Sequence, residues 1–292
     1  MIHTNAHLSI RIKGKLLQLH TPLVMAIINV TPDSFYTKSR INLPNEISTA
    51  VCSSLHQGAT IIDIGAYSSR PKEYYNNATD ISEKEEINRL DVALSACRKE
   101  FPDSIISLDT FRASVAEFAI KEYQVDIIND ISGGTLDKNM FDTIAKWNIP
   151  YVLTHIQGTP QTMQENPNYE HFIPEVLYYF SEKLDLLKQR GISDIIIDPG
   201  FGFGKTLEQN YALIAHFEVF HHFQLPIMVG ISRKSMIQKV IHTSAEESLN
   251  GTTALHTLLI EKGAHILRVH DVKEATEVIA LTEKLKTIHH DF

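Results

Sequence analysis

Polar and charged side chains close nearly every apolar run of this sequence, and they are the residues best suited to chemistry. They are Asn29, Asp63, Asp109, Asn129, Asp130, His155, Asp198, Ser232, Arg233, Lys234, Arg268 and His270. A strand that is buried on both faces ends in polar groups where its carboxyl end meets a ligand. The pattern therefore predicts one site built from carboxylates, amides and cations.

Each of these positions, taken alone, also has a structural interpretation. Aspartate and asparagine often cap helices or occupy turns. Arg268 and Lys234 fit that interpretation poorly, because neither is a capping residue at a helix N-terminus. These two cations therefore favour a binding site over a set of turns.

The elements that must position these residues follow a repeating order. After an opening that predicts a hairpin over 8–12 and 16–19, short apolar runs alternate with longer amphipathic segments. The runs are 23–30, 60–65, 104–109, 126–131, 150–155, 194–198, 225–231 and 265–270. The helical segments include 81–100, 113–122, 169–190, 245–261 and 272–289.

This alternation predicts an α/β fold with a parallel sheet covered by helices. Eight strand–helix units favour a single (β/α)8 TIM barrel, which typically takes about 250 residues. No linker or charge run divides the chain, so we expect one domain over 1–292, with 1–20 as a hairpin that caps the barrel. An open, doubly wound sheet is the alternative.

Composition limits the classes of function. The hydrophobic fraction of 43% and charged fraction of 21% are those of a globular protein. A net charge of −8 argues against a nucleic-acid partner. No apolar run approaches the roughly 18 residues that span a bilayer, and the polar N-terminus lacks a signal-peptide core. Only two cysteines are present, so we expect a cytoplasmic protein without a disulfide framework.

The seam of the barrel suggests where an anion would bind. Arg268 and His270 share parity on the last strand, so both face the barrel mouth if either does. Closing the barrel places this strand beside the first one, which ends at Asn29. Two cationic or donor groups and an amide would hold an anion.

Several familiar motifs are incomplete. Residues 198–206 (DPGFGFGKT) imitate a nucleotide-binding loop, but the P-loop requires glycine where Pro199 stands, and the dinucleotide fingerprint requires glycine at Lys205. We expect only a turn that a flat ligand can approach closely. Among fifteen histidines there is no His-Glu-x-x-His, which disfavours a zinc site. Cys52 and Cys97 have no obvious base nearby and are expected to be small core residues.

Several stretches, in order and at matching spacing, resemble the signatures of the dihydropteroate synthase family and span nearly the whole chain. They are 27–35 (IINVTPDSF), 61–65 (IIDIG) with 69–71 (SRP), 107–110 (SLDT), 128–133 (INDISG), 198–205 (DPGFGFGK), 230–234 (GISRK) and 268–272 (RVHDV). The resemblance implies a transferase of folate biosynthesis, commonly a homodimer and a sulfonamide target. Its members condense 6-hydroxymethyl-7,8-dihydropterin pyrophosphate with p-aminobenzoate, giving 7,8-dihydropteroate and pyrophosphate.

The resemblance also implies roles for individual residues. The pterin ligands would be Asp109, Asn129, Asp198 and Lys234, and the pyrophosphate ligands would be Asn29, Arg268 and His270. Asp109, Lys234, Arg268 and His270 would be the catalytic set. The p-aminobenzoate site would involve Ser69, Arg70, Phe203 and Ser232. A Mg²⁺ ion on the pyrophosphate would have Asn29, and Asp63 as a second candidate, close to it.

The chemistry expected of such a site is positioning and charge stabilisation. The aromatic amine is neutral near pH 7 and needs no strong base, so we expect a dissociative displacement at the exocyclic methylene. The dimer would use the helix 245–261.

Two loops depart from the family pattern, at 36–39 and 66–68, and Thr154 stands where many relatives have methionine. Two alternatives share the barrel: a pterin-dependent methyltransferase, which needs no pyrophosphate site, and a catalytically silent pterin-binding paralogue.

Overall fold

The computed structural model describes residues 8–30, 44–67, 81–159, 163 and 167–289. Within these ranges, eight parallel strands form one sheet in the order β8-β7-β6-β5-β4-β3-β10-β9. They are β3 (Leu23–Asn29), β4 (Ile61–Gly65), β5 (Ile105–Asp109), β6 (Ile127–Asp130), β7 (Tyr151–Thr154), β8 (Ile195–Asp198), β9 (Met228–Val229) and β10 (Ile266–Val269). Every expected strand is present, and the TIM-barrel prediction is confirmed.

The barrel closes between β8 and β9 through little backbone pairing. One parallel bridge joins Ile197 to Ile227, and the Ile197 amide donates to the Pro226 carbonyl at 2.9 Å. Pro226 has no N–H to donate in return. The run expected over 225–231 therefore narrows to the two residues of β9.

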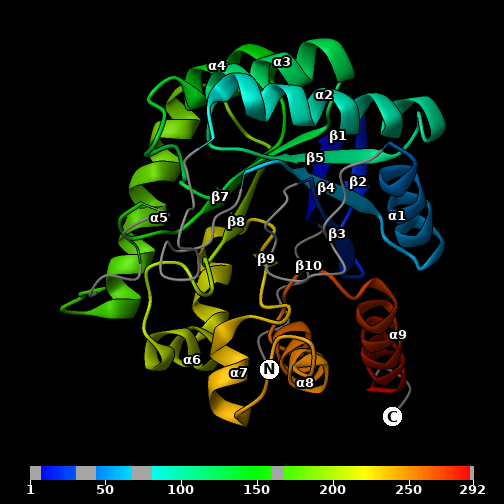
Figure 1. Cartoon of the computed structure of the whole chain (residues 1–292). Coiled ribbons are helices and arrows are strands. Elements are labelled where there is room, and N and C mark those ends of the chain that lie inside the picture. Colours follow the sequence, from blue (N-terminus) through cyan, green and yellow to red (C-terminus); the bar gives the residue numbers. More distant parts are fainter. Residues whose placement is uncertain (1–7, 31–43, 68–80, 160–162, 164–166, 290–292) are drawn as a thin grey trace.

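Helices surround the strands on all sides (Figure 1). They are α1 (Pro44–His56), α2 (Glu83–Glu100), α3 (Ala113–Tyr123), α4 (Met140–Trp147), α5 (Phe172–Gln189), α6 (Leu207–Ala215), the 3-10 helix η3 (Phe217–Phe223), α7 (Ser235–Ile241), α8 (Leu249–Glu261) and α9 (Val272–His289). None of the helices in the described ranges is both long and apolar enough to cross a membrane. The helix expected over 245–261 begins only at Leu249, because Arg233 binds the carbonyls of Ala245 and Glu246 and holds that segment in a turn.

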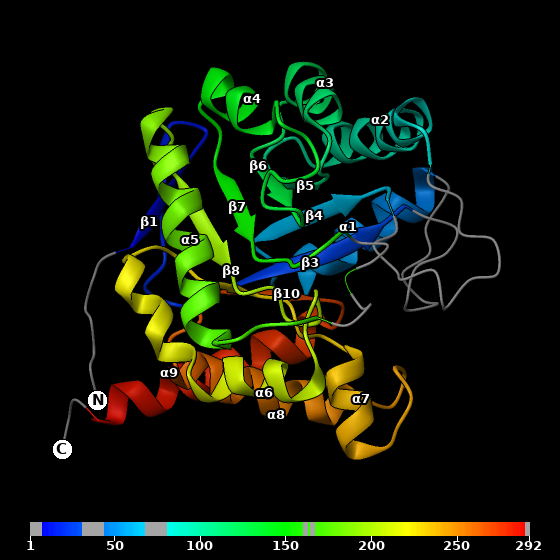
Figure 2. The same ribbon diagram turned by 90° about the vertical axis from the view of Figure 1, so that its left-hand side faces the viewer.

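The antiparallel hairpin β1 (Ser9–Ile12) and β2 (Lys15–Gln18) lies at the end of the barrel away from α7 (Figure 2). It is attached at the amino ends of two strands, since the Arg11 amide donates to Asp194 at 2.9 Å and Lys13 Nζ donates to the Ser104 carbonyl at 3.2 Å. Its apolar residues join the lowest layer of the barrel interior. This cluster contains Ile10, Ile12, Leu19, Met25, Ile61, Ile127, Val152, Ile196, Met228 and Ile266.

Alternation along the strands separates two environments. One set of side chains packs outward against the helices in a second apolar cluster, and the other set points into the barrel. The inward side chains are apolar at the hairpin end and polar toward the carboxyl ends of the strands. The fold therefore presents a polar layer on a rigid apolar floor.

Candidate active site

Each residue of the polar layer lies two positions after an apolar residue that points into the barrel from the same strand. The layer contains Asp63, Ser107, Asn129, Thr154, Asp198 and Arg268. The strand register places neighbours side by side: Asp63 pairs with Ser107, Asp109 with Asn129, and Thr154 with Asp198. Six strands thus contribute to one enclosed polar surface.

Arg268 is the centre of this layer. Its Nε donates to Asp63 at 2.7 Å, and its Nη2 donates to Asp109 at 2.6 Å. The Asn129 amide donates to the same Asp63 oxygen at 3.1 Å. Burial opposes the charge of Arg268, but the two carboxylates outweigh it and raise its pKa. Four strands, β10, β4, β5 and β6, are therefore joined by one polar cluster.

The two carboxylates of this cluster differ in their surroundings. Asp63 is fully buried, and its Oδ1 has no hydrogen-bond partner among the described residues. The Asp109 side chain keeps 20% of its surface exposed. Burial, and then the neighbouring Asp63 carboxylate, raise the pKa of Asp109, while Arg268 opposes this rise. Asp109 therefore faces the open mouth, and Asp63 lies beneath it.

On the opposite side, Asp198 and Lys234 form a second charged pair of neighbours. Asp198 Oδ1 accepts from the Gly200 amide at 2.8 Å. Lys234 Nζ donates to the Phe201 carbonyl at 2.5 Å and lies 4.2 Å from the centre of the Phe203 ring. Burial lowers the pKa of Lys234 to about 8, although Asp198 favours its charged form. Burial also raises the pKa of Asp198, and Lys234 opposes that rise.

The seam between β10 and β3 is formed as expected, with Arg268 beside Met25 in the parallel register. His270 follows β10 at the same parity as Arg268, and its backbone amide donates to Ser232 Oγ at 3.2 Å. Burial, and then Arg268, lower the pKa of His270 to about 4. Both effects favour the neutral form of His270, in which the imidazole can still form hydrogen bonds. Asn29 ends β3 on the neighbouring strand.

Some polar strand ends serve the fold instead. Asp130 has the opposite parity to Asn129 and accepts from the Ser132 and Gly134 amides and from Tyr151. Arg233 makes two 2.8 Å contacts with Asp271 as well as binding the segment before α8. For these positions the turn-residue interpretation is the right one. Ser69 and Arg70, expected near the amine, lie outside the described residues.

One buried carboxylate was not anticipated. Glu86 of α2 is fully buried, accepts from Thr110 Oγ1 at 2.7 Å, and pairs with Arg112 at 2.5 Å. Burial raises its pKa, and both partners oppose this. Its burial could have been predicted, because Glu86 lies on the same face of α2 as the buried Leu90 and Cys97. The first turn contains three glutamates, however, and the helix pattern alone does not show which of them is buried. Glu86 holds the start of the segment after Asp109.

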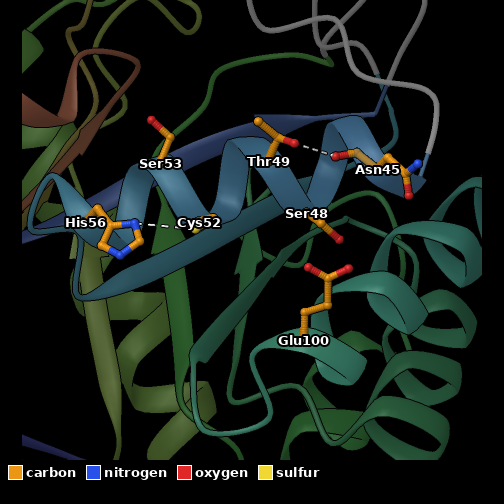
Figure 3. Close-up of a pocket in the computed structure, with 7 residues that line it drawn as sticks. All are labelled: Asn45, Ser48, Thr49, Cys52, Ser53, His56 and Glu100. Carbon is orange, nitrogen blue, oxygen red and sulfur yellow. Dashed lines mark hydrogen bonds between the residues drawn. The ribbon is translucent and has the colours of Figure 1, made fainter.

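The two cysteines differ from each other. Cys97 is buried in the core, as expected, and burial raises its pKa. The expectation for Cys52 was wrong: it is partly exposed, and its Sγ lies 3.3 Å from His56 Nδ1. Cys52 and His56 meet because residues four apart share one face of a helix. Figure 3 shows this pair in a surface pocket of about 540 Å³ between α1 and the end of α2.

The described residues contain no group of three or more histidine, cysteine or acidic side chains that could hold a metal ion. Oxygen donors nevertheless suit a hard cation that also binds its substrate's phosphates. The buried Asp63 Oδ1, which lacks a partner among the described residues, is such a donor, and Asn29 is a second one on the adjacent strand.

A (β/α)8 barrel whose carboxyl ends carry carboxylates, an amide and buried cations defines an enzyme that binds a polar, charged ligand. Residues 25–270 match the model of the family described as "Pterin binding enzyme". The chain is 40% identical to the dihydropteroate synthase of Escherichia coli K12 over 93% of this chain and 94% of that one, and 36% identical to that of Bacillus subtilis over 92% and 91%.

Solved structures agree with this result. The dihydropteroate synthase of Yersinia pestis, in a sulfonamide complex, superposes with a TM-score of 0.90 at 35% identity, over 96% of this chain and 100% of that chain. The enzyme of Xanthomonas albilineans with 4-aminobenzoic acid gives 0.84 at 29% identity, over 95% and 98%. The chain belongs to the dihydropteroate synthases of the pterin-binding enzyme family.

Proposed function

We propose that this chain joins 6-hydroxymethyl-7,8-dihydropterin pyrophosphate to p-aminobenzoate and releases pyrophosphate. The observation that carries the proposal is the charged layer in which Arg268 bridges Asp63 and Asp109 opposite Asp198 and Lys234. These groups provide the acceptors that a pterin edge needs and the cations that a phosphorylated ligand needs.

Pterin binding is assigned to Asp198, Asn129, Asp109 and Lys234. A pterin presents two neighbouring N–H donors, which a carboxylate can accept in a charge-assisted pair. Asp198 has one oxygen held by the Gly200 amide, so the orientation of its carboxylate is set before the ligand arrives. The Asn129 amide nitrogen donates one of its two N–H groups to Asp63, and the amide oxygen would accept from the ligand. The Lys234 ammonium would donate to the pterin carbonyl and ring nitrogen.

Pyrophosphate binding is assigned to Arg268, His270 and Asn29. The Arg268 charge is shared with two carboxylates, so the cluster by itself is a poor anion site. A Mg²⁺ ion would supply the positive charge that this cluster lacks, and Asn29 and Asp63 would hold the ion together with the phosphate oxygens. When bound, the ion neutralises charge that develops on the leaving group. Neutral His270 would donate a hydrogen bond to the same group.

Catalysis then depends on position and charge. Asp198, Asn129 and Asp109 hold the pterin ring, while Arg268 and His270 hold the leaving oxygens, so the bond at the exocyclic methylene is aligned for cleavage. The methylene C–O bond to pyrophosphate breaks, the neutral amine bonds to that carbon, and the proton that the amine then loses passes to water or to the released pyrophosphate. Phe203 lies against Lys234 at the pterin's edge, where the amine ring would stack, and Ser232 lies beside His270. Ser69 and Arg70 are further candidates for this site.

We also propose that the protein is a cytoplasmic homodimer. Both cysteines are free thiols, which suits a reducing compartment. Helices α8 and α9 pack side by side and expose large apolar side chains: Leu258, Leu281, Leu285 and Ile288. Exposed apolar surface of this kind favours association with a second copy. This face extends the interface expected on 245–261 to include α9.

A turnover assay tests the proposed reaction. Purified protein with Mg²⁺, the pterin pyrophosphate and p-aminobenzoate should form dihydropteroate and one equivalent of pyrophosphate. A silent paralogue would bind dihydropteroate without turnover. A methyltransferase would bind the pterin but would not discriminate in favour of the pyrophosphorylated ligand.

A further inference from the structure

The glycine-rich turn between β8 and α6 is wound around its own lysine. Lys205 is only 3% exposed, and its Nζ donates to three backbone carbonyls: His155 at 3.2 Å, Gly200 at 2.9 Å and Phe203 at 2.9 Å. Three hydrogen bonds from one nitrogen require three N–H donors, which only the ammonium form has. Burial lowers the pKa of Lys205, while Asp198 favours its charged form.

The turn fits this ammonium closely. Gly200 has φ +71°, and a Cβ there would lie 2.0 Å from the His155 carbonyl oxygen. Gly204 has φ +57°, and a Cβ there would lie 2.6 Å from the Gln157 carbonyl oxygen. Glycine is needed at both positions because the backbone is left-handed and packed against the end of β7. Lys205 therefore occupies the centre of the turn, whereas the lysine of a phosphate-binding loop points out to its ligand.

The same turn touches both members of the pterin-binding pair. The Gly200 amide donates to Asp198, and the Phe201 carbonyl accepts from Lys234. The Phe203 ring lies against the Lys234 ammonium. Thr206, the next residue after Lys205, forms a capping box with Gln209 and begins α6, so the turn is fixed at its far end as well.

We propose that Lys205 is a positioning residue for pterin binding, whose ammonium holds the 199–205 turn in the shape that orients Asp198 and Lys234. This inference rests on the proposed role of those two residues in binding the pterin. The competing possibility is that Lys205 only stabilises the fold. That possibility predicts a less stable protein in which Lys234 still contributes its full share to ligand affinity.

A double-mutant cycle separates these possibilities, with dihydropteroate affinity measured by calorimetry. Lys205→Met keeps the aliphatic stem and removes the three donors, and we expect it to weaken binding about 10- to 50-fold. Residues that act through one another are not additive. The double variant with Lys205→Met and Lys234→Met should therefore lose dihydropteroate affinity by a factor at least about fivefold smaller than the product of the two single-variant factors. A combined loss that lies within about fivefold of that product overturns the proposal.

Two controls accompany the cycle. Lys146→Met removes an exposed lysine on α4 and should leave dihydropteroate affinity unchanged. Inorganic pyrophosphate with Mg²⁺ should inhibit through the residues of β10 and β3. Its inhibition constant should therefore change less than about threefold in Lys205→Met, which is roughly the deviation from additivity seen for mutations at distant sites. A loss of pyrophosphate inhibition equal to the loss of dihydropteroate affinity would show a general disturbance and overturn the proposal.

Two further measurements test the proposal without the Lys205→Met variant, in case that variant does not fold. Gly204→Ala strains the turn without touching the ammonium, and it should lower dihydropteroate affinity more than pyrophosphate inhibition. In wild-type protein, nitrogen-15 NMR of the lysine side chains should show a slowly exchanging Nζ–H₃ signal that is assigned to Lys205. Its absence would contradict the buried ammonium. If wild-type protein does not bind dihydropteroate at all, the proposed function fails first, whatever the NMR signal shows.

Discussion

Removing the guanidinium of Arg268 tests the charged layer most directly. Arg268→Met keeps an apolar, flexible side chain but leaves Asp63 and Asp109 without the contacts at 2.7 and 2.6 Å. An uncompensated buried charge costs about 3–5 kcal/mol. Asp63 is fully buried, but Asp109 keeps contact with water, so we expect a loss near the lower end, about 3 kcal/mol of unfolding free energy.

A second substitution identifies the cause of that loss. Asp63→Asn in the Arg268→Met background removes the stranded charge and keeps its shape, so we expect it to restore about 1–2 kcal/mol. The assay is urea denaturation followed by circular dichroism, with an unchanged dependence on urea concentration as the condition for comparing variants. If the double variant is no more stable than Arg268→Met, the pairing with Asp63 is not what Arg268 contributes to the fold.

The same variants test the role of Arg268 toward the ligand. Losing charge-assisted contacts to a phosphate should weaken the pyrophosphorylated pterin by roughly 30-fold or more, and dihydropteroate, which has no phosphate, by much less. Asp63→Asn should not restore this affinity, because it supplies no cation. Equal weakening of the two ligands would refute the assignment of Arg268 to the pyrophosphate.

Four further results are expected. Asp198→Asn should weaken dihydropteroate binding by about a hundredfold or more while the protein stays folded. A near-normal affinity by calorimetry would show that another residue accepts the N–H groups of the pterin. Burial lowers the pKa of Lys234 to about 8, so dihydropteroate affinity should be highest below that pH and should fall as the pH rises through it. An affinity that stays constant between roughly pH 6.5 and 9.5 would contradict binding by the Lys234 ammonium. Excess EDTA should greatly slow turnover, and full activity would exclude the metal. Leu285→Glu should shift the protein from dimer to monomer in light scattering; a dimer that persists would exclude the α8–α9 face.

Local patterns anticipated much of the architecture. Each apolar run became a strand because alternation of buried strands with amphipathic helices has few other solutions. The parity of Arg268 and His270, and the adjacency of β10 and β3, also followed from counting along strands and closing the barrel. The 228–229 strand was shorter than expected because Pro226 limits backbone pairing beside it.

Sequence alone therefore determined the order of elements and the list of polar groups at their ends, because strand and helix periodicity are local properties. Only the tertiary structure decided how those groups pair. Arg268 is shared between Asp63 and Asp109, and Lys205 donates to three backbone carbonyls, because folding brings these groups together from separate parts of the chain into surroundings where water screens their charges less. The motifs alone could not show that Arg268 is shared with two carboxylates or that Lys205 is enclosed by its own loop, because both arrangements depend on burial.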